Sequence, residues 1–397
     1  MTKYSYNCYS CNSNYSAKQI EGNFVYLCPK CGTAEKQKPL KGILLPEYDY
    51  DYIKTEISRE NFLKLVPGKF WLYPNLGPIY FDKINRQILD RLILPADNLL
   101  NYKINSKEFF VLDETRNPTL SYKDRASNLV ALKAIELGIK EIAAASTGNA
   151  GSSLAGICAR LGLKSHIYVP KNIPEAKRIQ IEAYGADLVV VDGDYDSAFD
   201  KCLEDSIKNG WYNRNTAYNP LTIEGKKSAA FDIFIQTKGK IPEVIFIPAG
   251  DGVIISGIYK GFTELLKLGW IEKLPKLILI QSENGDAIVR FIEKGVFEYY
   301  PADTIADSIS AGAPRNLYMA AEAVKQTNGM AISISDTDIL QAQKKFIRKT
   351  GILCEPSSAA AYAAFKELKD DEIVRNKSVL LLITGNGLKD IKNLVKN

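Results

Sequence analysis

The sequence predicts an α/β fold of two doubly wound domains, preceded by a zinc-ribbon-like segment. Three observations support this prediction. From residue 109 onward, short apolar runs rich in β-branched residues alternate with helical stretches, which is typical of parallel strands covered by helices on both faces. Several of these runs end in glycine-rich turns. The N-terminal region carries two Cys-x-x-Cys pairs at the spacing of a metal-binding ribbon.

The N-terminal segment, residues 1–45, contains four cysteines in two pairs separated by 16 residues. Two such turns place four thiolates at the corners of a tetrahedron, the geometry of a structural zinc site. The alternative, two disulfides, conflicts with a cytoplasmic location. We therefore expect structural zinc, with the ligands Cys8, Cys11, Cys28 and Cys31.

The rest of the chain divides into strands and helices in order. A strand over residues 42–52 leaves the ribbon, a short helix covers 58–66, and an aromatic stretch at 69–76 packs in the core. Further strands are predicted at 109–112, 141–145, 165–169, 188–191, 243–248, 277–281 and 378–383. One helix is predicted to start at the N-cap Ser121 and to end at 138. Further helices are predicted at 150–161, 174–184 and 195–209 and in a stretch after 257. The expected domains are a large one, 46–127 with 236–397, and a small one, 128–235.

Composition and charge narrow the class of protein. The 397 residues are 46% hydrophobic and 24% charged, and their net charge of +5 is too mild to indicate a nucleic-acid partner. No apolar run is long enough to cross a membrane, and the first residues lack a signal-peptide core, so we expect a cytoplasmic protein. The single histidine, His166, argues against a Ser-His-Asp triad and against a His-rich metal site. Acid–base chemistry is left to other side chains or to a cofactor.

Residues 117–125 form a loop that leads into a helix, with Lys123 at the turn. Pro118 keeps Asn117 out of the helical conformation, and Asp124 suits the positive start of a helix. A surface lysine is the common interpretation of such a residue. The alternative is a partly buried amine with a lowered pKa, held at a helix start, that attacks a carbonyl group. These nine residues alone leave both interpretations open.

Three glycine-rich turns follow predicted strands, at residues 146–150, 250–257 and 384–387. Ligands of open parallel sheets bind at the carboxyl ends of the strands, so we expect these turns to converge. The turn at 250–257 is the best anion cradle, because its glycines let backbone N–H groups approach a phosphate just before a helix starts. Pyridoxal phosphate (PLP) explains the combination, since it needs a lysine for a Schiff base, a phosphate cradle and a partner for its ring nitrogen.

Six motifs follow one another along the chain: NPTLSYKDR (117–125), STGNAG (146–151), NPLTIEGKKSAAFDI (219–233), PAGDGVIISG (248–257), EPSSAAA (355–361) and TGNGLKD (384–390). With these motifs and the ribbon, the chain resembles the threonine synthases of the tryptophan-synthase-β group, the PLP enzymes of fold type II. The resemblance implies the two-domain fold of that group, a small amino-acid substrate and a homodimer, which is the usual oligomeric state of the group.

The resemblance also implies site residues. Lys123 would hold PLP and act as the catalytic base, Asn149 would bind the ring hydroxyl, and Thr384 would face the pyridine nitrogen. The cofactor phosphate would be bound by the loop residues Gly250, Asp251, Gly252, Val253 and Ile254. The amino-acid substrate would be bound by Ser146, Thr147, Ser121 and Asn219.

The implied activity is that of a PLP-dependent carbon–oxygen lyase, which converts O-phosphohomoserine and water into threonine and phosphate by γ-elimination and β-addition. The chain departs from the family pattern at Leu120, Tyr122 and Asn386, where glycine, phenylalanine and histidine are usual. Asp194 and Asp200 stand where the family has an Asn and an Arg that bind the substrate phosphate, and carboxylates repel a phosphate. The alternative is a related lyase that acts on another amino acid by β-elimination or β-replacement, such as a threonine or serine dehydratase.

Overall fold

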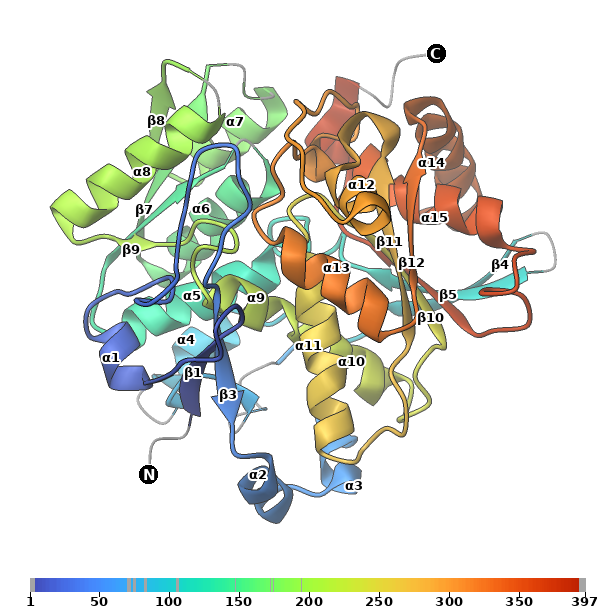
Figure 1. Cartoon of the computed structure of the whole chain (residues 1–397), viewed down its shortest axis with the longest axis horizontal. Helices are drawn as coiled ribbons and strands as arrows, with labels where there is room; N and C mark the ends of the chain where they lie inside the picture. The colour runs from blue at the N-terminus through green and yellow to red at the C-terminus, as the bar shows by residue number, and fades with distance from the viewer. Residues whose placement is uncertain are drawn as a thin grey trace.

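The computed structural model describes residues 4–392 apart from 70–72, 74–75, 82–83, 105–106, 147, 172, 174 and 194. Its strands form a three-stranded sheet near the N-terminus and two larger sheets covered by helices. Figure 1 shows the two helix-covered sheets side by side, with the N-terminal segment lying across the smaller one. The α/β class with two doubly wound sheets, predicted from the sequence, is confirmed.

The N-terminal sheet is antiparallel and has the strand order β2-β1-β3. Its strands are β1 (Tyr4–Cys8), β2 (Asn14–Ser16) and β3 (Leu44–Tyr48). The strand predicted over 42–52 is wrong beyond residue 48, because Asp49 caps a helix there by accepting a hydrogen bond from the backbone N–H of Tyr52. Ser58 caps another short helix within the predicted stretch 58–66.

The smaller helix-covered sheet is parallel, with the order β8-β7-β6-β9. Its strands and helices are β6 (Glu141–Ala145), β7 (Lys164–Pro170), β8 (Asp187–Val191), β9 (Tyr212–Asn213), α5 (Asp124–Glu136), α6 (Asn149–Leu161), α7 (Glu175–Ala183) and α8 (Tyr195–Asn209). Alternate residues of β6 face opposite helix layers. Ile142 and Ala144 pack with α5 and α6, whereas Ala143 and Ala145 pack with α8.

The larger sheet has the order β12-β11-β10-β13-β5-β4 and is parallel except for β4. Its strands are β4 (Leu99–Ile104), β5 (Lys107–Asp113), β10 (Val244–Pro248), β11 (Lys276–Ser282), β12 (Met330–Ile334) and β13 (Val379–Ile383). One face packs with α10 (Ser228–Gln236), α11 (Val253–Lys267), α12 (Ala287–Lys294) and α13 (Leu317–Gln326). The other face packs with α14 (Asp336–Thr350) and α15 (Pro356–Leu368).

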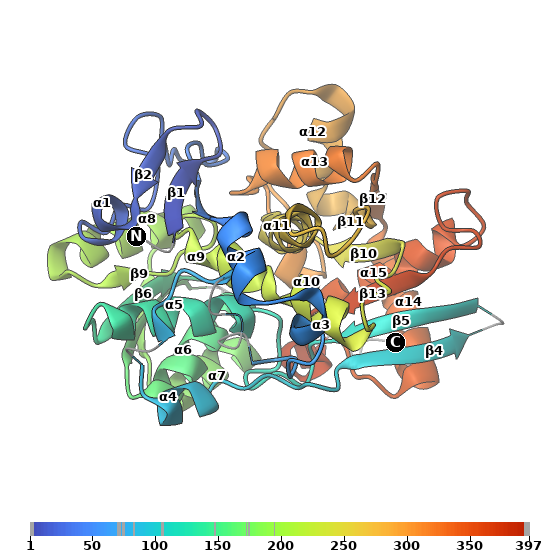
Figure 2. The ribbon, with the colours of Figure 1, turned by 90° about the horizontal axis from the view of Figure 1, so that it is seen from below.

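Short segments connect these layers. Helix α9 (Leu221–Lys226) lies against both α5 and α11, and therefore bridges the two large sheets. The remaining helices are α1 (Ala17–Glu21), α2 (Tyr50–Glu56), α3 (Arg59–Phe62), α4 (Arg86–Asp90) and the 3-10 turns Glu283–Gly285, Asp307–Ile309 and Gly387–Asp390. Seen from below, the zinc-ribbon-like N-terminal segment lies beside α8 and β9 (Figure 2).

Of the aromatic stretch 69–76, residues 70–72 and 74–75 lie outside the described residues, and Tyr73 and Leu76 are buried. None of the helices that the structure describes is long and apolar enough to span a membrane.

Candidate active site

Lys123 lies between the carboxyl end of β13 and the first turn of α5. The chain just before it is held by β13, because the backbone N–H of Tyr122 donates to the carbonyl of Thr384 at 2.8 Å. Lys123 itself occupies the N-cap position of α5. The predicted N-cap, Ser121, is wrong: its backbone forms an isolated bridge with Gly385, and the helix begins one residue after Lys123. A pairing between distant segments therefore sets the helix start.

Leu120 and Tyr122, two departures from the family pattern, each have a structural explanation. Leu120 has a φ of 66°, in the left-handed region where glycine is favoured, so the backbone accounts for the usual glycine at this position. Its carbonyl accepts a hydrogen bond from the N–H of Asn386 at 3.0 Å, which holds the strained turn. The Tyr122 hydroxyl donates to the carbonyl of Lys226 at 2.8 Å, a bond that phenylalanine cannot make. Tyr122 thus ties the lysine loop to the end of α9.

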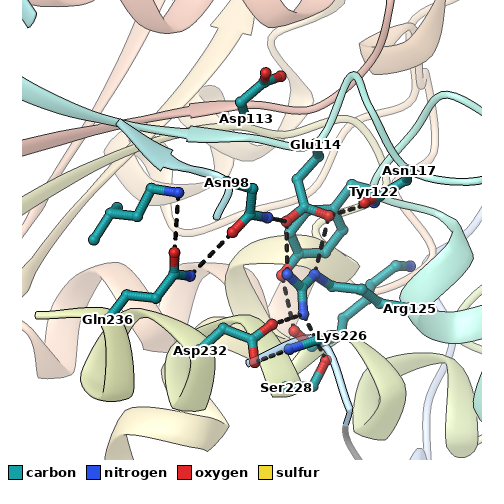
Figure 3. A network of polar contacts seen from close by, with 12 residues as sticks. Asn98, Asp113, Glu114, Asn117, Tyr122, Arg125, Lys226, Ser228, Asp232 and Gln236 are labelled. Atoms are coloured by element: carbon teal, nitrogen blue, oxygen red, sulfur yellow. Dashed lines mark hydrogen bonds and ion pairs between the residues drawn. The ribbon is translucent and has the colours of Figure 1, made fainter. Parts of the chain in front are cut away.

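A buried polar network next to Lys123 is centred on Arg125 (Figure 3). The guanidinium donates to both carboxylate oxygens of Glu114, at 3.0 and 2.6 Å, and to one oxygen of Asp232 at 2.6 Å. Other donors complete the two carboxylates, namely Asn98, Asn117, the backbone N–H of Gly68, and Tyr73. The network supplies partners for its own buried charges, and it fixes the start of α5 against the end of β5 and against α10.

An inner cavity opens over Lys123, with about 420 Å³ of empty space that extends to solvent. It brings together residues from the three predicted turns, and its lining includes Asn149, residues 248–254, Thr384, Tyr122, Lys123, Lys226 and Glu355. Lys123 is partly accessible through this cavity. The surrounding protein nevertheless withdraws the amine from solvent, and this burial lowers the pKa of Lys123 below its ordinary range. A lowered pKa increases the share of free amine, the form that attacks a carbonyl.

Asn149 begins α6 and reaches Glu355 across the inner cavity. Its Nδ2 donates to both carboxylate oxygens, at 3.1 and 3.0 Å, and to Ser308 Oγ at 3.0 Å. Its Oδ1 is buried and has no hydrogen-bond partner among the described residues. Sequence reasoning missed Glu355, although the motif that starts with it was noticed. A Cβ on Gly385 would lie 2.5 Å from a Glu355 carboxylate oxygen, so this close approach requires glycine.

Thr384 follows the last residue of β13 and presents a hydroxyl to the inner cavity. That hydroxyl lies 3.1 Å from Ser358 Oγ, which also accepts hydrogen bonds from the backbone N–H groups of Thr384 (3.0 Å) and Gly385 (2.8 Å). The Thr384 side chain is thereby oriented by the start of α15. Its position offers the cavity a neutral hydroxyl.

The loop between β10 and α11 covers only residues 249–252, so the turn predicted at 250–257 is wrong beyond residue 252, because the helix already begins at Val253. Gly252 is the N-cap of α11 with a φ of 79°, and a Cβ there would lie 2.7 Å from the Cβ of Ala320. A Cβ on Gly250 would lie 2.9 Å from the Cα of Ile309. The first N–H groups of the 15-residue helix α11 are available to an anion at this end. The carboxylate of Asp251, between the two glycines, accepts a hydrogen bond from the backbone N–H of Arg315 at 3.2 Å.

A wider outer cavity also includes Lys123 and opens further to solvent. Ser146 lines it directly after β6, whereas Thr147 lies outside the described residues. Its charged lining comprises Lys171, Arg315, Asp251 and Asp307. Asp307 forms an ion pair with the buried Lys177. Burial opposes the charged form of that lysine, yet the pKa of Lys177 is raised because Asp307 lies beside it.

Of the two aspartates that the sequence places near a substrate phosphate, Asp194 and Asp200, the structure describes only Asp200. Asp200 is exposed on α8 and is not among the residues that line the outer cavity, so the expectation that it faces the substrate is wrong. Its register on the helix turns the side chain away, which an ungapped alignment does not reveal. Asp194 lies outside the described residues, and its neighbours Gly193 and Tyr195 line the cavity.

Ser121 and Asn219, the other two residues predicted to bind substrate, line neither cavity. The Ser121 hydroxyl is buried without a hydrogen-bond partner in the described part of the chain. Asn219 donates to the carbonyl of Asn213 at 2.7 Å and accepts from the N–H of Leu221 at 2.9 Å. These bonds shape the turn that leads into α9.

Two buried lysines near the site escaped sequence reasoning, although both belong to the quoted motifs. Lys389 donates to Ser152 Oγ at 2.9 Å and to Gln180 Oε1 at 2.7 Å, and burial lowers its pKa to about 8. Lys226 lines the inner cavity and is fully buried. The only signal available in the sequence was their position beside motif residues, because burial of a lysine depends on contacts between distant segments.

The four cysteines of the ribbon come together as predicted. The Cys8 and Cys31 sulfurs lie 3.5 Å apart, the Cys11 and Cys28 sulfurs 3.6 Å apart, and all four lie within 4.8 Å of one another. A tetrahedral zinc ion with bonds of about 2.3 Å needs sulfurs about 3.8 Å apart. The thiol cluster therefore has a size that suits zinc.

Comparison with known proteins supports this reading of the site. The family model described as "Pyridoxal-phosphate dependent enzyme" matches residues 93–385. The threonine synthase of Methanocaldococcus jannaschii is 34% identical over 96% of this chain and 92% of its own length. The threonine synthase of Methanosarcina acetivorans is 33% identical over 99% of this chain and 94% of its own length.

Solved structures share the fold at lower identity. Maize serine racemase covers 79% of this chain and 95% of its own, with a TM-score of 0.66 and 20% identity. Threonine deaminase isoform 2 of Solanum lycopersicum covers 80% of this chain and 93% of its own, with a TM-score of 0.60 and 21% identity. The site geometry, the family match and the relatives agree: the chain belongs to the PLP-dependent enzymes of fold type II, and among these lyases to the threonine synthase family.

Proposed function

We propose that this protein converts O-phosphohomoserine and water into threonine and phosphate. One observation carries the proposal: the outer cavity, which shares Lys123 with the inner cavity, is lined by the cationic side chains Lys171 and Arg315, which suit a substrate phosphate. With Asp200 at the surface, one of the two expected sources of repulsion is removed. The relatives named threonine synthase, matched over nearly the whole chain, support the same reaction.

The residues of the inner cavity fit PLP. The buried Oδ1 of Asn149 is open to a donor, and Gly250 and Gly252 let the loop pack against Ile309 and Ala320, where a Cβ would clash. When bound, PLP supplies an aldehyde that reacts with amines and a ring that withdraws electrons from the α carbon. In this proposal Lys123 would hold the aldehyde carbon, Asn149 would contact the ring hydroxyl and residues 250–254 would bind the phosphate. Thr384 would offer its neutral hydroxyl to the ring nitrogen.

Lys123 lines both cavities, so its amine can hold the cofactor on the inner side and exchange a proton with the substrate on the outer side. The Lys123 Nζ would be the group that accepts the α proton of the substrate. Burial lowers the pKa of Lys123, which raises the share of the free amine that can accept the proton. Ser146, at the N-terminal end of α6, offers a hydroxyl and helix N–H groups to the substrate carboxylate.

A second candidate is a lyase that releases a keto acid from serine or threonine. It is favoured by Asp251 and Asp307, whose carboxylates line the outer cavity and disfavour a phosphate dianion. The ion pair between Asp307 and Lys177 offsets one of these charges.

Turnover of O-phosphohomoserine separates the two candidates. The purified PLP-loaded enzyme is expected to release phosphate and threonine in equal amounts, with no keto acid from serine or threonine. Arg315→Gln is expected to raise KM for O-phosphohomoserine about 10-fold or more, the loss of one charged hydrogen bond. Arg178→Gln is a surface control, because Arg178 lies on the exposed side of α7 and pairs with Glu182, whereas Arg315 is buried and also donates to the carbonyls of Glu35 and Lys38. Keto acid from serine or threonine, without phosphate release from O-phosphohomoserine, would overturn the proposal.

The proposal includes one structural zinc ion at the four thiols, a homodimer, a cytoplasmic location and the domain boundaries 46–127 with 236–397 and 128–235. Metal analysis of the purified protein is expected to find about one zinc per chain. Cys28→Ser is expected to lose the zinc and to lower the melting temperature, whereas Cys158→Ser, at an isolated buried thiol, is expected to retain the zinc. Zinc retained in Cys28→Ser would contradict the assignment. Sedimentation of the native protein tests the homodimer.

A further inference from the structure

Lys226 is placed next to the phosphate cradle by close helix packing. It is the last residue of α9, which lies between α5 and α11. A Cβ on Gly225 would lie 2.4 Å from the carbonyl oxygen of Arg125, and a Cβ on Gly257 would lie 2.8 Å from the Cβ of Lys226. The two glycines therefore let α9 approach both neighbours. The Lys226 stem starts beside the second turn of α11.

The position of its stem lets the Lys226 amine reach the start of α11. Gly257 lies four residues after Val253, the first residue of that helix, which corresponds to about 6 Å of helix rise. A lysine stem of four carbons can extend over such a distance. Lys226 lines the inner cavity together with residues 250–254, but it does not line the outer cavity. Its environment is thus the part of the site assigned to the cofactor.

The Lys226 amine has no internal partner. The side chain is fully buried, and its Nζ has neither a hydrogen bond nor an ion pair within the described part of the chain. Burial lowers the pKa of Lys226 well below its ordinary range, and the nearby positive charges of Lys123 and Arg214 lower it further. A buried amine without a partner is costly and calls for an external acceptor.

The charges around Lys226 favour an anion. Arg214 is also fully buried, and its Nη2 lacks a hydrogen-bond partner among the described residues. Burial lowers the pKa of this guanidinium to about 10. The charges that act on the Lys226 amine are those of the basic groups Lys123 and Arg214 and of one acidic group, Asp251. Around Lys226 the basic groups therefore outnumber the acidic one.

We propose that Lys226 binds the phosphate of PLP, so that the cradle recognises this phosphate through a lysine amine as well as through the backbone N–H groups of residues 250–254. Pairing of the amine with a phosphate oxygen satisfies a buried donor and forms a charge-assisted hydrogen bond. The inference rests on PLP as cofactor and on the proposed cradle. It holds for either candidate substrate.

The test compares PLP with pyridoxal, which lacks the phosphate, in the full-length apoenzyme without substrate. Dissociation constants are measured from the visible absorbance and from tryptophan fluorescence. Lys226→Met is expected to weaken PLP binding about 10- to 100-fold, the worth of a charge-assisted hydrogen bond, and to leave pyridoxal binding unchanged. The melting temperature of the apoenzyme is expected to stay the same or to rise, because an unpartnered buried amine has been removed.

Two further variants keep the comparison decisive. Lys226→Gln retains a donor without charge, so it is expected to give a smaller selective loss, and it replaces the methionine variant if that one does not fold. Lys133→Met is the matched control, since Lys133 is equally buried but pairs with Glu21 and Glu136. This control is expected to melt at a lower temperature with an unchanged ratio of PLP to pyridoxal affinity.

The outcomes separate this inference from the proposed function. Equal losses of PLP and pyridoxal affinity in both Lys226 variants, or no loss of either, would overturn the role of Lys226 and leave the cofactor site intact. Failure of the wild-type protein to bind PLP would instead overturn the proposed cofactor site itself.

Discussion

Arg125 and Lys226 are both buried basic side chains on neighbouring helices, yet their surroundings are opposite. The Arg125 guanidinium is bonded to Glu114, Asp232 and Ser228, and the carboxylates have further donors of their own (Figure 3). The Lys226 amine has no partner in the described part of the chain. Removal of one member of a paired, buried charge network is strongly destabilising, whereas a buried polar group left without a partner indicates a binding site.

The comparison extends to other parts of the molecule. The Arg125 network supplies partners for the buried charges of Arg125, Glu114 and Asp232 from within the protein. The inner cavity, with Lys226 and the unpaired Oδ1 of Asn149, has groups whose partners must come from a ligand. Substitutions in the network should therefore act on folding, and substitutions in the cavity should act on binding and catalysis.

The largest effect on the cavity side is expected for Lys123→Ala. Loss of the amine removes both the attachment of PLP and the base for the α proton, so turnover should fall by at least about 10³-fold. Folding should be retained, because the substitution removes a desolvated amine and breaks no network bond. Steady-state kinetics and thermal melting check both parts. Substantial turnover in this variant, or unfolding at room temperature, would contradict the assignment.

The largest effect on the network side is expected for Arg125→Met. Two buried carboxylates would lose their counter-charge, and the free energy of unfolding should fall by about 3–5 kcal/mol. Chemical denaturation measures the change. Arg178→Met, which breaks an exposed pair with Glu182, serves as control and should cost less than about 1 kcal/mol. A similar small loss for both variants would show that the network does not carry the stability assigned to it.

Tyr122→Phe tests the link between the two regions. The variant loses the 2.8 Å hydrogen bond to the carbonyl of Lys226, and stability should fall by about 1 kcal/mol. PLP affinity should fall slightly as well, since α9 then holds Lys226 less firmly. Tyr52→Phe, at an exposed residue, should change neither quantity. The link fails if the two variants behave alike in denaturation and in PLP titration.

A smaller effect concerns the pH dependence of stability at Lys389. Burial lowers its pKa to about 8 from an ordinary 10.5. Between these values the unfolded chain binds more protons than the folded one, so the free energy of unfolding rises with pH across this window. The cost of burying Lys389 is therefore greatest below pH 8. The melting temperature of the wild type, relative to that of Lys389→Met, should rise as the pH is raised from about 8 to about 10. A constant difference over this range would rule out the shifted pKa.

The sequence predicted the parts of the site that follow from strand ends. Parallel strands bring their carboxyl ends to one edge of a sheet, so Lys123, Asn149, Thr384 and the cradle could be expected to meet, and the structure brings them to one cavity. The edge strands β4 and β12 were missed. They are only half buried, and their sequences lack the continuous apolar run of the central strands.

What sequence could not supply depended on contacts between distant segments. Ser121 has the composition of an N-cap, but its pairing with Gly385 moves the helix start. Asp200 was placed near the substrate by alignment, and the register of α8 exposes it to solvent. The outer cavity is lined from many separate loops, so Arg315 and Asp307 could not be assigned to it in advance.

Oxygen-18 labelling tests the central claim, carbon–oxygen lyase chemistry on O-phosphohomoserine, most directly. In ¹⁸O-labelled water the γ C–O bond breaks, the bridging oxygen leaves with phosphate, and water oxygen enters at the β carbon. Mass spectrometry should find one ¹⁸O in the hydroxyl of threonine and none in the released phosphate, and Lys123→Ala should give neither product. Labelled phosphate together with homoserine, or keto acid in place of threonine, would contradict the account.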